Sequence, residues 1–492
     1  MSYEGHLQIW GPSPGPEWGS GGIFGLSYCN RILYFTLAFE AKAFFLGREA
    51  RVYDFHLVGP GPASGGDTYN AVYCGGEELF FGGWVHAPVV FKGKTGTSGE
   101  IDFRNKHSHV HVYDTERDEV RLLWKESAHH ESRWVGEISE IVFSSLRDSL
   151  FLARGDGHEN LGIFELERGG KMHRLSDLPG LKGAHFLDYA CFDIQGDWAG
   201  GIDGIQCFDL QSAKSYRYFV QDWTKVSVDG GGVLWRGSGY AISAFARYYH
   251  FFRGGVLVGN PVEPELERPT FLRLMDFGVR GAPQPSPQRS NALPIGGGIL
   301  APFSSMPHGG LHIPDVSVVR DINEVRAPSV LIYISPPQAR IVGVYGARIT
   351  SMTKAGSKVL IGYNTAPNLG GKDSSPLDIG FRGITSVDEE QLINRQSPPV
   401  LLKFRGNNVL NEHFGGIPLL GYRERKLVLL SSRDNVLEVF ESDAGTPPEL
   451  LSSESYSIKT GKNEIDLGGF VGIVSFRVRE RDSSLRLYVS LQ

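Results

Sequence analysis

A pair of glycines followed by a short apolar run recurs along the chain at intervals of roughly 50 to 70 residues, a period typical of the blades of a β-propeller. Full copies begin at Gly21, Gly82, Gly231, Gly297, Gly415 and Gly468, and copies that keep one glycine begin at Gly136, Gly183 and Gly346. Glycine is favoured where the innermost strands of a propeller converge and a Cβ would collide, although the same residues could simply make turns. The repeat predicts stacked β-sheets.

Each repeat contains short runs rich in β-branched and aromatic residues, separated by polar turns. In one repeat the runs cover residues 137–145, 149–154, 161–167 and 171–175, and in the next they cover 185–194, 197–202, 205–210 and 215–219. Each run suits a strand and is too short for a typical helix. The sequence therefore predicts blades of four antiparallel strands.

We expect one all-β domain over residues 1–492, a seven- or eight-bladed β-propeller of four-stranded antiparallel blades, because the repeat covers almost the whole chain. Only two strands are expected after Gly468, so we expect them to complete a blade with the N-terminal region. Such pairing of N- and C-terminal strands would close the ring. Proline and glycine predict that residues 59–66, 281–289 and 368–376 are loops on its rim.

Charge and hydropathy exclude two classes of partner. The formal net charge is −6, and no block rich in Lys and Arg resembles the basic patches of nucleic-acid-binding proteins. No uninterrupted apolar run approaches the about 18 residues of a membrane span. We expect no nucleic-acid partner and no membrane partner.

The cysteines and the first residues predict the compartment. Cys29, Cys74, Cys191 and Cys207 are far apart and form no Cys-x-x-Cys pair, so reduced, buried thiols are expected rather than a disulfide framework or a zinc knuckle. Residues 1–10 lack the basic start and apolar stretch of a secretory signal. These features predict a cytoplasmic protein.

Eight of the 15 histidines lie between His86 and His173. His107, His109 and His111 alternate with other residues, which places them on one face of a strand. Two neighbouring imidazoles could share a divalent transition metal with a ligand from elsewhere, which His86 or His158 could supply. His86 and His109 are the candidate metal ligands. The alternative is that these histidines are hydrogen-bonded to neighbours on half-exposed strands.

The segment 154–160 (RGDGHEN) is the most polar interruption of a predicted blade. In a catalytic interpretation His158 is the acid/base, Asp156 or Glu159 orients it, and Arg154 binds an anion. Because Asp-Gly is also a strong hairpin signal, the segment could equally be a polar turn. Ligand contacts are expected from Trp84, as a stacking surface for a sugar ring, and from His107 and His308. His308 lies in a later repeat whose polar loop could face the segment 154–160 across the channel. 

Three segments carry a resemblance to a known family. They are FGGWVHAP (81–88), NKHSHVH (105–111) and RDSLFLARGDGHENLG (147–162), and they resemble an archaeal family called domain of unknown function 2139. The resemblance implies an archaeal, propeller-like protein and transfers no catalytic residue.

Two classes of function follow. The first is an interaction scaffold that binds an unknown protein partner, a small molecule or a glycan through its rim loops. The second is a carbohydrate-active lyase or hydrolase with a His-rich, metal-dependent site at the channel mouth. The scaffold is favoured because no recognised catalytic spacing occurs in the sequence. Fold analogy alone cannot decide the matter.

Overall fold

The computed structural model describes residues 7–8, 23–37, 41–61, 63–65, 70–88, 91–92, 100–101, 103–127, 130, 136–156, 159–195, 201–220, 225–227, 233–235, 237–278, 286–287, 289–304, 329–364 and 382–492. These residues form an all-β, propeller-like molecule whose larger sheets are antiparallel and contain four or five strands. Among the described residues, no helix is long and apolar enough to cross a membrane.

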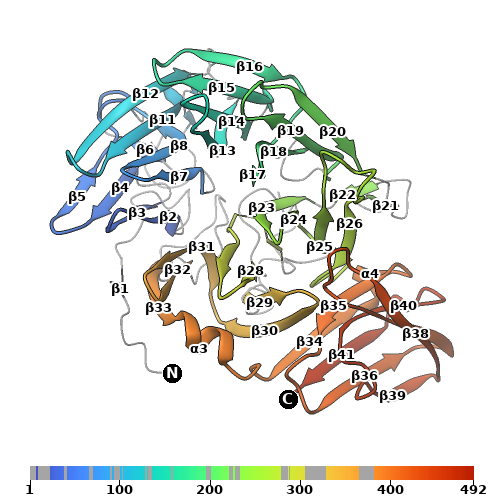
Figure 1. Cartoon of the computed structure of the whole chain (residues 1–492). Helices are drawn as coiled ribbons and strands as arrows, with labels where there is room; N and C mark the ends of the chain where they lie inside the picture. The colour runs from blue at the N-terminus through green and yellow to red at the C-terminus, as the bar shows by residue number, and fades with distance from the viewer. Residues whose placement is uncertain are drawn as a thin grey trace.

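Seven sheets follow one another around a circle in chain order (Figure 1). The first contains β2 (Ile23–Cys29), β3 (Ile32–Leu37), β4 (Lys42–Leu46) and β5 (Ala50–Tyr53). In the second, β8 (Glu78–His86) pairs with β6 (Ser64–Gly65), β7 (Val72–Gly75) and β11 (Lys106–Asp114), and β11 pairs with β12 (Glu119–Ser127). The third contains β13 (Glu137–Ser144), β14 (Ser149–Asp156), β15 (Ile163–Glu167) and β16 (Met172–Ser176). The fourth contains β17 (Gly183–Phe186), β18 (Tyr189–Ile194), β19 (Gly204–Asp209) and β20 (Ser215–Phe219).

The fifth sheet contains β23 (Ser238–Ala244), β24 (Arg247–Phe252), β25 (Gly255–Gly259) and β26 (Thr270–Arg273). The sixth contains β27 (Leu293–Ile295), β28 (Gly298–Phe303), β29 (Ser329–Ser335) and β30 (Gln338–Tyr345). The seventh contains β31 (Arg348–Ala355), β32 (Lys358–Asn364), β33 (Arg382–Asp388) and, at its edge, β1 (Leu7–Gln8). Short elements outside these sheets are the pairs β9 (Phe91–Lys92) with β10 (Glu100–Ile101) and β21 (Lys225–Ser227) with β22 (Val233–Trp235), η2 (Phe103–Asn105), α3 (Glu389–Asn394) and α4 (Gly406–Val409).

From the first sheet to the fifth, the first strands of neighbouring sheets contact one another, with β7 taken for the second sheet. β31 contacts both β27 and β2, so the seventh sheet packs against the first. From β2 to β31, the first strands of these sheets, with β7 taken for the second, begin between 46 and 65 residues apart, which agrees with the predicted period. The glycines occupy several roles, however. Gly136 and Gly183 stand at the start of a first strand as predicted, whereas Gly82 lies inside β8 and Gly297 lies in the turn before β28. The period was right although the glycine pair does not mark one position.

The predicted strands of the third sheet agree with β13 to β16 to within two residues at either end. The prediction for the next sheet was wrong at its start, because 185–194 is a hairpin in which β17 turns into β18 at Leu187 and Asp188. Residues 201–202, predicted as the end of a strand, are not in one, and 197–200 lie outside the described residues. Of the predicted rim loops, Ser64–Gly65 is strand β6, and 368–376 is outside the described residues.

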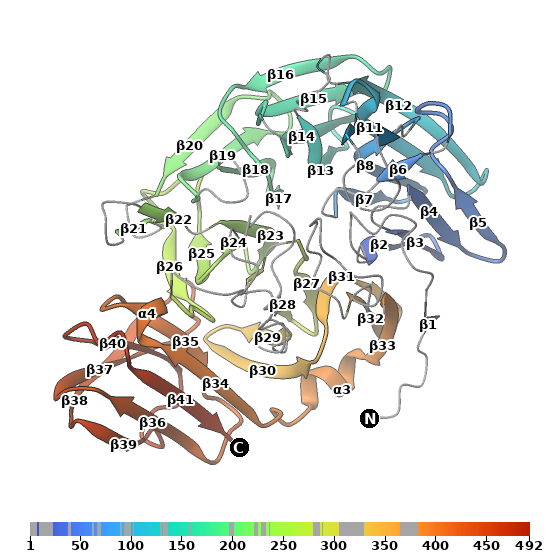
Figure 2. The same cartoon turned by 180° about the vertical axis from the view of Figure 1, so that it is seen from behind.

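The C-terminal strands form two further sheets beside the ring, seen from the front in Figure 1 and from behind in Figure 2. One has the order β34 (Val400–Arg405), β41 (Arg486–Leu491), β36 (Arg425–Ser431) and β39 (Gly461–Asp466). The other has the order β35 (Phe414–Pro418), β40 (Ile473–Val478), β37 (Asn435–Ser442) and β38 (Leu450–Ile458). The expected pairing of the two chain ends is therefore wrong. β1 pairs with β33, and among the described residues β40 and β41 pair with strands of the C-terminal sheets. Their apolar side chains continue into the core of the fifth and sixth sheets, since Phe476 and Leu487 belong to the same buried cluster as Phe251 and Ile299.

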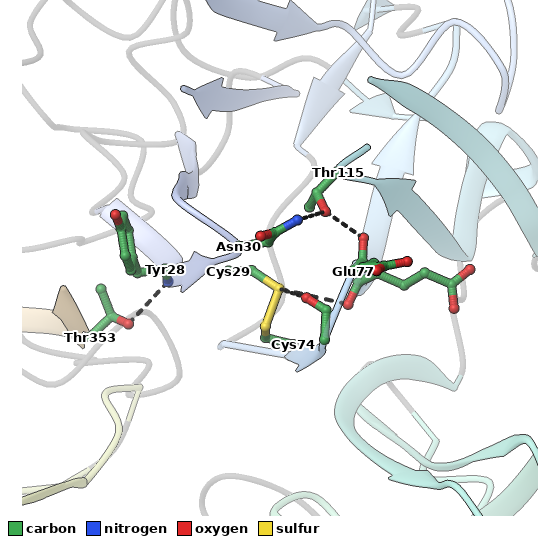
Figure 3. The surroundings of a disulfide bond; sticks show 9 residues. Tyr28, Cys29, Asn30, Cys74, Glu77, Thr115 and Thr353 are labelled. Atoms are coloured by element: carbon green, nitrogen blue, oxygen red, sulfur yellow. Dashed lines mark hydrogen bonds between the residues drawn. A yellow bond between two sulfur atoms is a disulfide. The ribbon is translucent and has the colours of Figure 1, made fainter. Parts of the chain in front are cut away.

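The expectation of reduced thiols is also wrong. Cys29 at the end of β2 is disulfide-bonded to Cys74 in β7, which joins the first sheet to the second (Figure 3), and Cys191 in β18 is bonded to Cys207 in β19. Cysteines 45 residues apart meet because strand pairing and sheet packing bring them together. On the other side of β2, the Tyr28 backbone N–H donates to Thr353 Oγ1 at 3.1 Å, so both neighbours of β2 are attached to its end.

Candidate functional site

Strands β8 and β11 present their candidate residues on two opposite faces. Lys106 pairs with His86 across the two strands, and His109 pairs with Gly83. Because side chains alternate along a strand, Trp84, His86 and Lys106 lie on one face, and His107 and His109 lie on the other. The predicted shared face of His107, His109 and His111 agrees with this register, but His86 is not brought to His109.

His109 and His111 belong to the core between the first two sheets. The Nδ1 atoms of the two rings are 3.1 Å apart, and His111 Nε2 is 2.8 Å from the Tyr53 hydroxyl. The His109 ring centroid is also 5.1 Å from that of Phe55. Burial lowers the pKa of His109 to about 3, so its ring is neutral near neutral pH. His109 and His111 are hydrogen-bonded, as the alternative interpretation expected, but they are fully buried rather than half-exposed. The expected sharing of one metal by His86 and His109 is corrected, because the two rings lie on opposite faces.

Four charged side chains meet on the side of Lys106: one from the second sheet, two from the third and one from the segment that precedes the sixth. Lys106 at the start of β11 forms an ion pair with Glu137 at the start of β13. Glu137 stands opposite Asp156, the last residue of β14. Asp156 Oδ2 is 4.0 Å from Nη2 of Arg289, which precedes the sixth sheet. We call Lys106, Glu137, Asp156 and Arg289 the central charge cluster; each of the four residues is at most 8% exposed.

Burial dominates the electrostatics of the central charge cluster. It raises the pKa of Glu137 to about 7, against the attraction of Lys106 and with the repulsion of Asp156 added to it. Burial also lowers the pKa of Lys106, against the favourable charges of Glu137 and Asp156. The pKa of His86 falls to about 2 because the ring is buried beside Lys106 and His107. Removal from water is thus the largest cause of the shifts of Glu137, Lys106 and His86.

Trp84 and His86 adjoin this cluster. The Lys106 ammonium lies over the Trp84 ring, 4.1 Å from its centroid, in a cation–π contact. The His86 ring meets the Trp84 ring edge-on at 5.3 Å between centroids. The predicted sugar-stacking face of Trp84 therefore already carries a cation. His107, on the far face, is half-buried, and burial together with nearby Lys125 lowers its pKa.

Arg289 is held in place by its own segment. Ser286 and Ser304 exchange two backbone hydrogen bonds at 2.9 Å, and the Asn291 amide bonds the backbone of Met352 in β31. A Cβ on Gly239 of β23 would lie 2.9 Å from the backbone carbon of Pro287, so only glycine permits this approach. Residues 286, 287 and 289, the described part of the expected rim loop 281–289, are therefore buried. They bring the Arg289 guanidinium from the segment before the sixth sheet to Asp156 of the third sheet.

Arg154 and Asp156 are separated by the fold. The Arg154 guanidinium bonds Glu126 Oε2 at 2.7 Å and the Gly136 carbonyl, and it lies 4.8 Å from the Trp124 ring centroid. It is a buried contact between the second and third sheets and does not join the central charge cluster. His158 and His308 lie outside the described residues. No group of three or more His, Cys, Asp or Glu side chains among the described residues is arranged to hold a metal ion.

The profile of a family described as uncharacterised proteins conserved in archaea, domain of unknown function 2139, matches residues 33–372. The chain belongs to this family. The match covers five of the seven ring sheets completely, from the second to the sixth; it begins inside β3 and ends before β33. It therefore contains Lys106, Glu137, Asp156 and Arg289 and leaves out the two C-terminal sheets. The resemblance to this family that was expected from residues 81–162 is confirmed, because these residues lie within the match.

Solved structures similar to this family member are distant. A streptogramin B lyase has 9% identity and a TM-score of 0.40, with 79% of this chain and 100% of that chain covered. Virginiamycin B lyase from Staphylococcus aureus has 8% identity and a TM-score of 0.39, with 75% and 95% covered. The extracellular domain of a putative hybrid two-component system from B. thetaiotaomicron has 12% identity and a TM-score of 0.42, with 98% and 58% covered. No curated protein matches the chain in sequence.

A second buried polar group joins the fourth and fifth sheets. Ser238 Oγ is 2.5 Å from His250 Nε2, and Asp193 Oδ2 is 3.8 Å from the same nitrogen. In a catalytic triad the carboxylate and the hydroxyl meet different nitrogens of the imidazole. Here all three residues are fully buried, and His250 Nδ1 faces the Tyr248 hydroxyl at 3.2 Å. The group therefore ties two sheets together and is no nucleophile.

Sequence reasoning missed Lys106, Glu137 and Arg289. Lys106 and Glu137 begin strands β11 and β13, both almost entirely buried, so a charge at the first position was the available signal. Arg289 gave no signal, because it follows a segment rich in proline and glycine that is typical of surface loops.

Proposed function

We propose that the seven sheets form a closed seven-bladed propeller in which β1 supplies the outer strand of the last blade. Support comes from the packing of β31 against β2 and from the pairing of β1 with β33, which brings the N-terminal strand to the last sheet of the ring. A single cooperative unit over residues 1–492 stays a prediction, and the apolar core shared by the C-terminal sheets and the ring supports it.

We propose that this propeller is a ligand-binding scaffold whose site is the central charge cluster. The observation that carries the proposal is the convergence of Lys106, Glu137, Asp156 and Arg289 from two sheets and the segment before a third. Buried ion pairs are weak contributors to stability, since apolar side chains of similar volume often stabilise a protein as well or better. Four charges buried together at a ring centre are therefore better explained by recognition, and groups with shifted pKa values gather at functional sites.

The chemistry of the cluster indicates a small hydroxylated acid. Lys106 and Arg289 offer charged donors to a carboxylate, and Asp156 accepts from hydroxyls. Burial raises the pKa of Glu137, so its carboxyl holds a proton more readily than that of an ordinary glutamate and can donate as well as accept. A uronic acid combines these features, and free glucuronic acid is the probe we would use, with glucose as the uncharged comparison.

The test is a thermal shift titration of the purified protein. Glucuronic acid should raise the Tm in proportion to the logarithm of its concentration once the site is saturated, and glucose should not. Glu137→Gln, which keeps the shape of the side chain, and Lys106→Met should both abolish the shift. The matched control is Glu165→Gln, because Glu165 is also buried and paired, with Arg147 at 2.7 Å, but lies outside the cluster. A shift that survives both cluster variants would refute the site.

One observation supports the alternative function, a carbohydrate-active hydrolase. Glu137 and Asp156 are carboxylates on facing strands, and the pKa of Glu137 is raised to about 7, where a carboxylic acid can act as general acid at neutral pH. We propose hydrolysis of a glycuronide as the reaction to test. Release of 4-nitrophenol from its glucuronide should be absent in Glu137→Gln and normal in Glu165→Gln; no release from the wild type would leave the scaffold as the function.

The cytoplasmic location likewise stays a prediction. Disulfides are rare in the cytosol, but intracellular proteins of hyperthermophilic archaea are rich in them. The two disulfides and the archaeal family are consistent with such a source. Mass spectrometry of the protein isolated from its own cells under alkylating conditions would test whether both bonds exist there.

A further inference from the structure

The two-residue turn after the first strand of a sheet carries unusual residues in the fourth and fifth sheets. In four other sheets this turn begins with a residue suited to a positive φ: Asn30 at 45°, Gly76 at 77°, Gly296 at 50° and Gly356 at 62°. In the fourth and fifth sheets the same place holds Leu187 at a φ of 49° and Phe245 at 53°. Large side chains rarely adopt this conformation, and residues kept in it against stability gather at functional positions.

Both side chains are exposed, Leu187 to 49% and Phe245 to 42%. Two more exposed leucines stand at the same end of neighbouring strands. Leu146, 68% exposed, lies in the turn between β13 and β14, and Leu266, 79% exposed, lies in the loop between the third and fourth strands of the fifth sheet. In an antiparallel sheet that loop stands at the same end as the turn between the first two strands. We call Leu146, Leu187, Phe245 and Leu266 the apolar tips.

Backbone contacts join the tips of the third and fourth sheets. Arg147, next to Leu146, donates from Nη1 to the Gln211 carbonyl in the turn between β19 and β20 at 3.0 Å. The N–H of Leu210 in that turn donates to the carbonyl of Asp188, next to Leu187, at 2.9 Å. The three turns therefore form one continuous surface.

The tips of the fourth and fifth sheets are joined as well. Tyr189 after the turn of the fourth sheet and Val262 in the loop of the fifth pack against the same buried cluster. Arg247, which follows the turn of Phe245, forms an ion pair with Glu267, next to Leu266. The apolar tips thus belong to one surface that spans three consecutive sheets.

Three carboxylates beside the tips are without ion pairs in the described part of the chain. Asp188 follows Leu187, and Glu263 and Glu265 come shortly before Leu266. All three side chains are exposed. Most other charges in these turns are balanced: Arg147 pairs with Glu165, Asp148 with Arg168 and Arg247 with Glu267, and Asp209 lies near Lys214. Arg268, which donates to the Tyr218 hydroxyl at 3.4 Å, offsets at most one of the three carboxylates.

We propose that the apolar tips bind a segment of a protein partner in which Lys or Arg side chains stand beside apolar ones. The apolar side chains of the partner would cover the tips, and its cations would pair with Asp188, Glu263 and Glu265. Two copies of this chain that met through their tips would bring these carboxylates together instead. The same carboxylates would repel the phosphates of a nucleic acid or of anionic lipids, so the charges select a cationic partner.

The apolar tips are independent of the central charge cluster and of the function proposed for it. Glu137 is the first residue of β13, whereas Leu146 comes two residues after the last. The two sites therefore stand at opposite ends of this strand.

The experiment measures binding of the full chain to a 14-residue amphipathic peptide of Leu and Lys, with a peptide of Leu and Glu as the comparison. We expect binding to the Lys peptide that weakens with added salt, and no binding to the Glu peptide. Leu187→Asn/Phe245→Asn should weaken binding about 25-fold, because covering a half-exposed Leu or Phe contributes a factor of about five. Its Tm should not fall, since asparagine accommodates a positive φ better than either residue. The matched control Leu450→Asn/Leu451→Asn removes exposed apolar side chains of β38 and should bind like the wild type.

A second pair of variants tests the charges. Asp188→Asn/Glu263→Gln should weaken binding of the Lys peptide about ten-fold, since each exposed charge contributes a factor of about three. Glu49→Gln/Glu412→Gln, which removes two exposed carboxylates elsewhere, should bind like the wild type.

Four results would overturn the proposal. Absence of binding to the Lys peptide would remove the partner, and equal binding of the Glu peptide would remove the role of charge. Equal loss in the variants of the tips and their controls would remove the site. A dimer of the wild type in sedimentation velocity that Leu187→Asn/Phe245→Asn abolishes would assign the tips to a second copy of the chain. Glu137→Gln should bind the Lys peptide normally, which distinguishes a failure of the central charge cluster from a failure of the tips.

Discussion

Removing the disulfide between Cys29 and Cys74 should lower the free energy of unfolding by about 4 kcal/mol. The bond closes a sequence separation of 45 residues, and the entropy that such a crosslink removes from the unfolded chain corresponds to about 4 kcal/mol at 25 °C. The bond between Cys191 and Cys207 closes only 16 residues and should contribute about 3 kcal/mol. If all 492 residues unfold together, 4 kcal/mol corresponds to a Tm lower by about 4 °C.

The two bonds also differ in their accessibility. Cys74 is exposed, whereas Cys191 and Cys207 are fully buried. Mild reductant should therefore release only two thiols from the folded protein, and alkylation followed by mass spectrometry should locate them at Cys29 and Cys74. The assay is calorimetry of the oxidised wild type, the mildly reduced wild type and the Cys29→Ala/Cys74→Ala variant. The reduced wild type carries no cavity, so its agreement with the variant isolates the effect of the crosslink. A Tm within 1 °C of the oxidised wild type for both would refute the reasoning, as would release of Cys191 before Cys74.

Three further predictions concern the cluster, a close backbone approach and the extent of cooperativity. The pKa of Glu137 is raised from 4.5 to about 7 in the folded chain, so between these pH values only the unfolded chain loses the proton, and the free energy of unfolding falls as pH rises. In urea titrations, the free energy of unfolding of Glu137→Gln relative to that of the wild type should increase by more than about 1 kcal/mol from pH 5 to pH 7. An equal pH dependence in the two proteins would contradict the shift. Gly155→Ala should lower the yield of folded protein or the Tm strongly because its Cβ would lie 1.9 Å from the Gly180 carbonyl oxygen, while Gly169→Ala, with no atom within 4 Å, should melt like the wild type. Phe476→Ala should cost about 3 to 5 kcal/mol, because this side chain is fully buried in the core shared by the C-terminal sheets and the ring; one calorimetric transition shifted as a whole is expected, and a separate early transition would show that residues 400–492 unfold by themselves.

Local patterns predicted the strands well where turns had ordinary chemistry. In the third sheet, Ser149–Asp156 and Ile163–Glu167 are bounded by polar turns, and the expected ranges agree with the structure to within two residues. The hairpin inside 185–194 was missed because Leu187 adopts a φ of 49° in its turn, a conformation for which glycine or asparagine would have been the usual signal. Strand alternation also placed His107, His109 and His111 on one face correctly.

The candidate site could be predicted only in part. Asp156 was chosen from a polar segment and lies in the central charge cluster, but its companions Lys106, Glu137 and Arg289 come from other sheets. Arg154, two residues away from Asp156, has its guanidinium bound to Glu126 between two sheets. Closeness in sequence therefore did not predict which charged side chains contact one another in the folded protein.

The sequence alone determined the all-β character, the period of about fifty residues, the four-stranded antiparallel sheets and the family, because each depends on contacts within one repeat or on local motifs. Tertiary structure decided the pairing of β1 with β33, the separate C-terminal sheets, both disulfides and the central charge cluster. These features join residues from 16 to several hundred positions apart. Such contacts form only when whole sheets pack, and no local propensity records which sheet a strand will meet.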